Sequence, residues 1–582
     1  MAEAPSSRRW LWLSMGLCSA VVLATCLPVL WHPQLEPDDY RYLDQLQLLE
    51  RGKSSGLAEA FVVENRWDHL WWVDTDQRIR FFRPLVLLSY GLTGPSPRGL
   101  LLTNLLLHWA CVLLVGFLLY RWLGAGLPAL VGATGFAALH CHSEVIYYVA
   151  GRTDTLAALG VLAGLAVHVG ARRRGLRWLG LPCLAFALSA KELGVVLPVL
   201  CLLHDLWNGE RPRRLGEVIR ADWRLWASYA AVLAGWLVLR QVVLGPGAGS
   251  VFPYFVSPAH PGFAAHLWTQ FRSYSENLLF ARSTPPFLQL EYLGRYTSAG
   301  GLAVTVAVLV GATVLLRRER RFWFFAAAGA LAALLTCAVY VSERYLYLPS
   351  FAAAGVAGLF VARLGGRRWL HVAVAVVGLG WAGYQGWMLC AKNLRILGSP
   401  RSASVVDQQL SAAASRIPKG ARLLFVNLPG DWLHAQFAAA QARVTLRDPD
   451  LEVDVLTVMP WDGLQGARMG LHRDGARSLT LEAARLPEPD GPASVMMTER
   501  YFTFPWAALD TGRSYAARRP PGFAVEVLAG RGRSAQRLKF TMPRPLTDYV
   551  LCVWTPNPDP GLHWLQRRLQ SHLQVVGGAS AP

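Results

Sequence analysis

Charged residues are scarce in this chain. Only 16% of its 582 residues are Asp, Glu, Lys or Arg, whereas 53% are hydrophobic and the mean hydropathy is +0.29. A soluble protein of this length carries about a quarter charged residues. The deficit argues against an ordinary soluble protein and indicates that a bilayer forms part of its surroundings.

The chain also lacks paired cysteine motifs. Most of its nine cysteines lie in hydrophobic runs, and no CxxC pair occurs, so no disulfide framework is indicated. The formal net charge is +19, but neither zinc-finger spacing nor an aromatic-basic RNA motif accompanies it. We therefore expect no nucleic-acid partner and attribute the basic excess to membrane topology.

Long hydrophobic runs, by contrast, are frequent. A helix needs about 20 apolar residues to cross the hydrocarbon core. About eleven segments approach this length, and they lie near 10–31, 99–121, 127–142, 152–170, 176–190, 193–207, 225–244, 299–316, 322–341, 346–363 and 370–390. The first has no clear A-x-A site, which favours an uncleaved helix over a signal peptide. The predicted fold class is a polytopic α-helical membrane protein with about 11 transmembrane helices.

The loops between these segments differ in charge. Basic clusters such as Arg317-Arg318-Glu319-Arg320-Arg321 fall on the same side as Arg8 and Arg9, and the positive-inside rule makes that side cytoplasmic. Compact clusters of mixed charge fall on the other side. The Ala-, Arg-, Gly- and Leu-rich composition suggests the bacterial inner membrane, with a cytoplasmic N-terminus.

Two outer loops, 32–98 and 245–298, are long. Apolar residues at helical spacing in the first loop, and again from Phe263 to Phe280, predict helices lying in the membrane interface. Three tryptophans of the first loop are expected at headgroup level: Trp67, Trp71 and Trp72.

The character of the chain changes near residue 392. Residues 392–582 contain no apolar run long enough to span, and two segments, 422–428 and 452–458, have the patterns of a buried and a half-exposed strand. With an odd number of spans, this part is predicted to be a soluble extracytoplasmic, periplasmic domain of α+β or mainly β fold. Residues 1–391 form the predicted transmembrane catalytic domain.

Two adjacent carboxylates follow the first span. Asp38 and Asp39 are placed at the outer face, where an enzyme acting on a lipid-anchored substrate needs a base. The alternative is an N-cap, because Asp38 precedes a helical pattern that starts near Tyr40. The sequence leaves both interpretations open.

Three further polar clusters fall on the same face. They are His140-x-His142-x-Glu144 with Arg152 and Asp154, Lys191-Glu192, and Glu343-Arg344. Simpler explanations are polar helix ends, a local Lys191–Glu192 ion pair and an arginine that extends to the interface. A divalent metal is possible but not favoured, because residues at i and i+2 are poor helical partners for one ion. Together, carboxylates and cations on one face suit transfer from a phosphate-linked donor.

The order of motifs along the chain resembles a known family. The motifs are Asp38-Asp39; Phe82-Arg83-Pro84-Leu85; Asn104-x-x-x-His108; His140-x-His142-x-Glu144-Val145; Gly151-Arg152-x-Asp154; Ser189-Ala190-Lys191-Glu192; and Glu343-Arg344-Tyr345-Leu346-Tyr347-Leu348-Pro349-Ser350. They look like the membrane part of the tetratricopeptide-containing transmembrane O-mannosyltransferases. That family belongs to the GT-C superfamily, with the protein O-mannosyltransferases. The resemblance covers roughly residues 10–395.

The resemblance implies a GT-C-like fold and an inverting glycosyltransferase without a required cofactor. The donor would be a sugar, mannose in that family, linked to a polyprenyl phosphate, and the acceptor a hydroxyl on the outer face. Asp38 would be the base and Asp39 its neighbour at the donor. Three cations would contact the donor phosphate: Arg152, Lys191 and Arg344. The remaining residues would shape the site: Arg83, His108, His142, Glu144, Asp154, Glu192 and Glu343.

The chain also departs from the family pattern. Cys141 stands where Pro is common, Ala190 is inserted in a Ser-Lys-Glu run, and no 34-residue repeat follows the membrane part. The acceptor thus remains open among protein, glycan and lipid. Two other functions are alternatives: a transporter or flippase of a lipid-linked saccharide, which would favour charges near the midplane, and a non-catalytic membrane scaffold.

Overall fold

The structure is a computed structural model. It describes residues 5–52, 61–66, 70–72, 78–171, 173–207, 214–245, 255–286, 288, 290–364, 368–397, 402–430, 432–459, 468–484, 509–517, 522–531, 534–556 and 571–576. The chain divides into two compact units, which are described separately. The helical unit comprises residues 1–33, 82–250 and 254–398, and the strand-containing unit comprises 34–81, 251–253 and 399–582.

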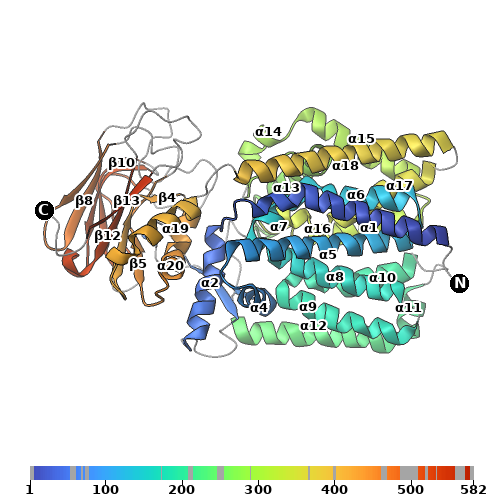
Figure 1. The fold of residues 1–582 in the computed structure, drawn as a ribbon, viewed down its shortest axis with the longest axis horizontal. Coiled ribbons are helices and arrows are strands. Elements are labelled where there is room, and N and C mark those ends of the chain that lie inside the picture. The colour runs from blue at the N-terminus through green and yellow to red at the C-terminus, as the bar shows by residue number, and fades with distance from the viewer. Residues whose placement is uncertain are drawn as a thin grey trace. The chain divides into compact units, whose positions relative to one another are not determined.

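Helices running side by side build the helical unit (Figure 1). Each of the eleven predicted segments contains an α-helix: α1 (Pro5–Cys26), α5 (Pro97–Leu123), α6 (Leu127–Ala138), α8 (Arg152–Gly170), α9 (Gly180–Ala190), α10 (Val196–Trp207), α12 (Trp223–Leu244), α15 (Ala299–Leu316), α16 (Arg320–Leu334), α17 (Ser350–Arg363) and α18 (Arg368–Leu397). Among the described residues, 6 helices are long and apolar enough to cross a membrane. This confirms the polytopic helical fold.

Small residues allow the central helices to approach closely. A methyl group at Gly132 of α6 would lie 2.8 Å from the Ala354 carbonyl oxygen of α17, and one at Gly160 of α8 would lie 2.9 Å from the Cys183 carbonyl oxygen of α9. Between membrane helices the hydrophobic effect is weak, so close backbone packing supplies much of the attraction. These glycines therefore fix the middle of the bundle.

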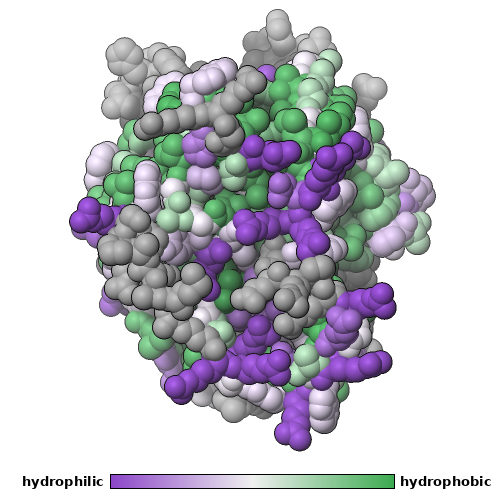
Figure 2. All heavy atoms as spheres, turned by 90° about the vertical axis from the view of Figure 1, so that its right-hand side faces the viewer, coloured by the Kyte–Doolittle hydropathy of each residue, from purple (hydrophilic) through white to green (hydrophobic). Residues whose placement is uncertain are grey.

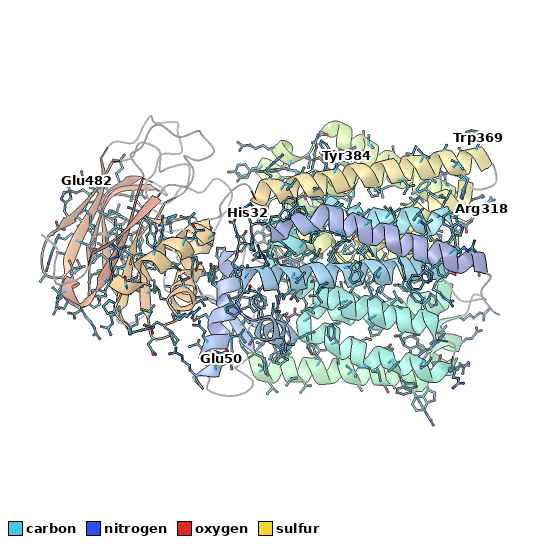
Figure 3. The ribbon with its side chains drawn as sticks, in the orientation of Figure 1. His32, Glu50, Arg318, Trp369, Tyr384 and Glu482 are labelled. Carbon is cyan, nitrogen blue, oxygen red and sulfur yellow. The ribbon has the colours of Figure 1, made fainter. Side chains whose placement is uncertain are left out.

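The two ends of the helical unit carry different loops. The N-terminus, Arg318 and Trp369 lie at one end, whereas His32 lies at the opposite end (Figure 1 and Figure 3). Figure 2 shows the face at the N-terminal end, where hydrophilic side chains gather among apolar ones. Arg318 is exposed in the loop between α15 and α16. Arg318 and His32 thus lie at opposite ends of the helical unit, and which end faces the cytoplasm stays a prediction.

Short elements connect the long helices. The α-helices among them are α4 (Pro84–Thr93), α7 (Ser143–Tyr147), α11 (Leu215–Ala221), α13 (Phe263–Phe280) and α14 (Leu293–Tyr296). The 3-10 helices are η1 (Leu27–Leu30), η2 (His140–His142), η3 (Val149–Gly151), η4 (Arg174–Leu179), η5 (Glu192–Val195), η6 (Leu290–Tyr292) and η7 (Glu343–Leu346). Helix α13 has the bounds of the helix predicted within the second outer loop, Phe263 to Phe280.

Side chains of α18 cap the C-terminal end of α13. Trp381, Tyr384 and Gln385 donate hydrogen bonds to the carbonyl oxygens of Leu279, Phe280 and Leu278, at 3.2, 2.8 and 2.8 Å. The last carbonyl groups of a helix have no partner within the helix. Side chains of α18 satisfy three of them here, which fastens the second outer loop to the last membrane helix.

Two sheets and three helices make up most of the strand-containing unit. One sheet has the order β13 (Ser571–Val576), β12 (Val550–Pro556), β3 (Arg422–Val426) and β5 (Glu452–Val455); the other has the order β7 (Arg468–Arg473), β8 (Ser478–Ala484), β11 (Ser534–Thr541), β10 (Ala524–Arg531) and β9 (Ser514–Ala516). The helices are α2 (Pro37–Glu50), α19 (Ser402–Ala413) and α20 (Trp432–Leu446), and two small pairs are β1 (Val62–Arg66) with β2 (Arg78–Phe82) and β4 (Leu428–Pro429) with β6 (Val458–Met459). Strands β3 and β5, which are parallel neighbours, match the two predicted strand segments.

Part of the first outer loop packs within this unit rather than in a membrane interface. Arg443 of α20 donates to both carboxylate oxygens of Asp44 on α2, at 2.8 and 2.6 Å. The expected headgroup position of Trp71 and Trp72 is wrong, because both are buried and the Trp71 indole donates to the Leu456 carbonyl oxygen. Trp67 lies outside the described residues.

A buried carboxylate joins α13 to the start of α15. Glu276 accepts a hydrogen bond from the backbone N–H of Ser298, the N-cap of α15, at 2.8 Å. A negative charge at a helix N-terminus is favourable. A methyl group at Gly301 would lie 1.9 Å from this carboxylate, whereas one at Gly300 would have no neighbour within 4 Å. Glycine at 301 therefore makes the contact possible.

We expect Gly301→Ala to lower the free energy of unfolding by about 1–3 kcal/mol, because it overpacks the Glu276 contact. The matched variant Gly300→Ala should raise stability by about 0.5–1 kcal/mol, since alanine is the better helix former. Thermal unfolding of the purified protein in detergent measures both. Equal stability of the two variants would contradict the role assigned to Glu276.

Candidate active site

The predicted site residues fall into both units. Asp38 and Asp39 belong to the strand-containing unit, and all of the others belong to the helical unit. Within the helical unit, η2, α7, α8, η5 and η7 supply most of them. Hydrogen bonds and ion pairs connect many of these residues, although they lie far apart in the sequence.

Glu144 holds the segment that carries Arg344. Its carboxylate accepts hydrogen bonds from the Ser342 hydroxyl at 2.7 and 2.9 Å and from the Arg344 backbone N–H at 3.0 Å. The Arg344 Nε lies 3.9 Å from the same carboxylate. Glu144 thus fixes the position of the η7 backbone and lies near the charge of Arg344.

The Arg344 guanidinium is surrounded by tyrosine rings. Its central carbon lies 5.3, 5.6 and 5.5 Å from the ring centres of Tyr148, Tyr340 and Tyr345, and it donates to the Tyr340 hydroxyl. Among the described residues, the Arg344 Nε has no hydrogen-bond partner. The aromatic faces stabilise the cation and leave this donor group unused.

Lys191 is the second cation of this cluster. Its ammonium lies 4.6 Å from the ring centre of Tyr345, so this ring contacts both cations. It forms an ion pair with Asp154 at 2.5 Å. Burial lowers the pKa of Lys191 to about 8 although Asp154 acts in the opposite direction, and the charges of Arg344 and Arg83 lower it further. Lys191 therefore loses its proton more readily than an exposed lysine.

The neighbouring acid has different partners. Glu192 lies 3.5 Å from the Arg240 Nε, so the local Lys191–Glu192 ion pair considered from the sequence gives way to two separate pairs. Burial acts to raise the pKa of Glu192, but Arg83 and Arg240 outweigh it and keep the pKa below its ordinary value. Arg83 precedes α4 and acts on both Lys191 and Glu192.

Arg152 lies deeper in the helical unit and is 0% exposed. Its guanidinium donates to the Asn104 side-chain oxygen at 3.0 Å, the Ser89 hydroxyl at 3.2 Å and the Leu100 carbonyl oxygen at 2.8 Å. It also lies over the ring of Tyr90 at 4.5 Å. These contacts join α4, α5 and α8, so Arg152 positions these helices relative to one another. The phosphate contact that the resemblance implies for Arg152 stays a prediction.

The two site histidines pack together in an aromatic cluster. The His108 and His142 ring centres are 5.2 Å apart. His108 Nδ1 lies 2.9 Å from the Tyr347 hydroxyl, and His142 Nε2 lies 3.0 Å from the Ser350 hydroxyl. Both histidines thereby contact the end of the Glu343–Ser350 motif, His108 from α5 and His142 from η2.

Glu343 faces a different set of groups from its neighbour Arg344. It accepts a hydrogen bond from the Thr284 backbone N–H at 2.7 Å and forms an ion pair with Lys392 at 2.5 Å. The sequence alone missed Lys392 because it follows the last hydrophobic run directly. It also missed Ser342, Tyr148 and Tyr340, and it gave no role to Tyr345, although that residue belongs to the Glu343–Ser350 motif.

Asp38 and Asp39 have different surroundings although they are adjacent. Helix α2 begins at Pro37 with Glu36 as its N-cap, and the Asp39 carboxylate accepts a hydrogen bond from the Glu36 backbone N–H at 2.8 Å. Asp39, rather than Asp38, therefore contributes to the helix start. Asp38 lies 3.9 Å from Arg41.

From the sequence, a metal site is possible but not favoured. In the described part of the chain, no group of three or more His, Cys, Asp or Glu side chains is arranged to hold a metal ion. The side chains that the structure brings together here are cations, tyrosines and carboxylates.

No protein-family profile matches the chain, and no curated protein matches it in sequence. Solved structures to which it is similar include ArnT from Cupriavidus metallidurans bound to undecaprenyl phosphate, at 13% identity and a TM-score of 0.44, covering 78% of this chain and 85% of that chain. Another is the Archaeoglobus fulgidus oligosaccharyltransferase tethered with an acceptor peptide, at 10% identity and a TM-score of 0.44, covering 76% of this chain and 64% of that chain.

We expect Arg152→Lys to lower the free energy of unfolding by about 2 kcal/mol or more, because a lysine cannot reproduce the planar set of donors that serves Asn104, Ser89 and Leu100. The exposed Arg98 on α5 provides the matched control, and Arg98→Lys should change stability little. Thermal unfolding in detergent compares the two. A stable Arg152→Lys variant would show that this guanidinium is not needed for packing.

Proposed function

We propose that the protein is an integral-membrane glycosyltransferase that moves a sugar from a polyprenyl-phosphate carrier to an acceptor hydroxyl on the outer side of the membrane. The single observation that carries this proposal is the pair of cations on one tyrosine ring, Lys191 and Arg344 beside Tyr345. Among the described residues, the Arg344 Nε makes no hydrogen bond, although it lies 3.9 Å from the Glu144 carboxylate. The order of motifs that resembles the GT-C mannosyltransferases supports it.

A phosphate is the ligand that this pair suits best. Arginine binds phosphate oxygens through paired N–H groups, and lysine adds a mobile point charge. The acids that hold the cations, Glu144 and Asp154, fix their positions before a ligand arrives. Such preorganised charge is effective against charge that develops on a leaving group.

The proposed reaction is a single displacement. The Asp38 carboxylate takes the proton of the acceptor hydroxyl, and the acceptor oxygen forms a bond to the anomeric carbon from the face opposite the phosphate. The bond between that carbon and the phosphate oxygen breaks, its electron pair stays on the departing polyprenyl phosphate, and the configuration inverts. Arg344 and Lys191 stabilise the resulting negative charge, so the leaving group needs no acid.

His32 lies at the end of the helical unit opposite the N-terminus (Figure 1 and Figure 3). With a cytoplasmic N-terminus, this end is the periplasmic side of the inner membrane in our proposal. Mannose is a candidate sugar, and the acceptor is a protein, a glycan or a lipid.

We expect Asp38→Asn to lower the rate of sugar transfer about 100-fold or more, because the amide cannot accept the acceptor proton. Its stability should stay close to that of the wild type. Asp39→Asn is the matched control, and it should lower stability by about 1 kcal/mol through the weakened helix start. Transfer of radiolabelled sugar from a panel of polyprenyl-phosphate donors to extracted acceptors measures activity. Full activity of Asp38→Asn would remove Asp38 as the base.

We expect Arg344→Ala to weaken binding of the polyprenyl-phosphate donor about 10-fold or more, because it removes a charged hydrogen-bond donor from a buried site. The exposed Arg363, which lies 3.9 Å from Glu319, provides the control, and Arg363→Ala should leave donor binding unchanged. Binding of fluorescent or radiolabelled donor to the purified variants tests this. An unchanged affinity for Arg344→Ala would reject the phosphate site.

A further inference from the structure

A second polar cluster lies beside the phosphate site and uses none of its cations. Asn277 of α13 is 0% exposed, and neither its amide nitrogen nor its amide oxygen makes a hydrogen bond of good geometry among the described residues. His140 of η2 is 1% exposed, and the Asn277 side chain is close enough to act as a weak hydrogen-bond partner of its ring. That contact occupies one atom of the Asn277 amide, so at least one atom of this buried amide is unused.

Unused polar atoms at such depth need a physical explanation. Burying an amide without hydrogen bonds is costly, and most buried polar groups in proteins have a partner. If Asn277 served only to fill space, a leucine of similar size would do so without the cost of an incompletely paired amide. A ligand that supplies both donors and acceptors accounts for the retained amide.

The neighbours of Asn277 indicate the chemistry of that ligand. Lys392 lies close to the His140 ring and is neutralised by Glu343 at 2.5 Å. The exposed Ser283 hydroxyl reaches His140 Nε2 at 3.5 Å, which is a long hydrogen bond, so this side of the cluster is the one open to a ligand. A cluster with balanced charge and many donors and acceptors suits neutral hydroxyl groups rather than a second phosphate.

The cluster is joined to the phosphate site through the backbone. Glu343 and Arg344 are consecutive, so their Cα atoms are about 3.8 Å apart. The Ser342 backbone N–H donates to the Tyr274 hydroxyl at 3.2 Å. Tyr274 lies three residues before Asn277, on the same face of α13. Consecutive residues of η7 therefore carry the two clusters, and one face of α13 contacts the same segment.

We propose that Asn277 and His140, with the Lys392–Glu343 pair, bind hydroxyl groups of the sugar that the carrier brings. This inference rests on the proposed function and deepens it, because it assigns the residues that distinguish a sugar-bearing donor from the bare carrier. The amide of Asn277 offers a hydrogen-bonding atom to a ring hydroxyl, which can donate and accept. The Lys392–Glu343 pair adds one group of each kind.

The test compares binding of undecaprenyl phosphate with binding of undecaprenyl phosphate that carries mannose or glucose. The wild type should prefer a sugar-bearing form. Asn277→Leu should reduce that preference about 10-fold or more, while affinity for the bare carrier stays unchanged. Asn277→Ala should give the same loss, which keeps the test valid if the leucine variant does not fold.

Asn393 of α18 provides a matched control for the same substitution. Its amide is equally buried but fully used, since it donates to the Thr25 carbonyl oxygen at 2.9 Å and accepts from the Ser143 hydroxyl at 2.8 Å. Asn393→Leu should lower stability but keep the preference for the sugar-bearing carrier. Asn277→Leu should keep or raise stability but reduce that preference.

Two outcomes would overturn the sugar subsite. One is an unchanged preference in both Asn277 variants, and the other is a wild type that binds the bare carrier as tightly as both sugar-bearing forms. Failure of the proposed function has a different signature. In that case, Arg344→Ala would retain full affinity for the bare carrier, whatever the Asn277 variants do.

Discussion

The carboxylate of Glu144 is the contact on which the arrangement of the candidate site depends. It accepts hydrogen bonds from Ser342 and Arg344, which lie 198 and 200 residues further along the chain. Charged acceptors form strong hydrogen bonds when water is excluded. Because the backbone of η7 is fixed in this way, Arg344 faces the tyrosine cluster while Glu343 faces Lys392. One acid therefore separates a cationic region from a region of balanced charge.

Charge pairing between distant segments explains why so many ionisable groups are tolerated here. Asp154 pairs with Lys191, Glu343 with Lys392 and Glu192 with Arg240. Unpaired charges at such sites are costly, whereas paired and hydrogen-bonded ones persist. Lys191 still has a lowered pKa, because two further cations lie near it and burial outweighs the single carboxylate. Added negative charge would stabilise its protonated form, which is what a phosphate ligand supplies.

The sequence predicts the helices of this protein better than their partners. Hydrophobic length is a local property, so the segments near 10–31 and 299–316 and the helix at Phe263–Phe280 could be placed from composition alone. Partners depend on tertiary contacts. The pairing of Lys191 with Asp154, the burial of Trp71 and the association of α2 with α20 could not be read from neighbouring residues. Uncharged site residues such as Tyr345 gave no compositional sign.

The two adjacent acids near the start of the chain show why a one-residue difference matters. Successive side chains on a helix point about 100° apart. Asp39 points back to the helix start and satisfies the Glu36 N–H, so its carboxylate already has a structural task. Asp38 is the second residue of the same helix and lies near Arg41 at 3.9 Å, a distance at which the attraction is weak. The two carboxylates, although adjacent, therefore face different groups: the start of α2 for Asp39 and Arg41 for Asp38.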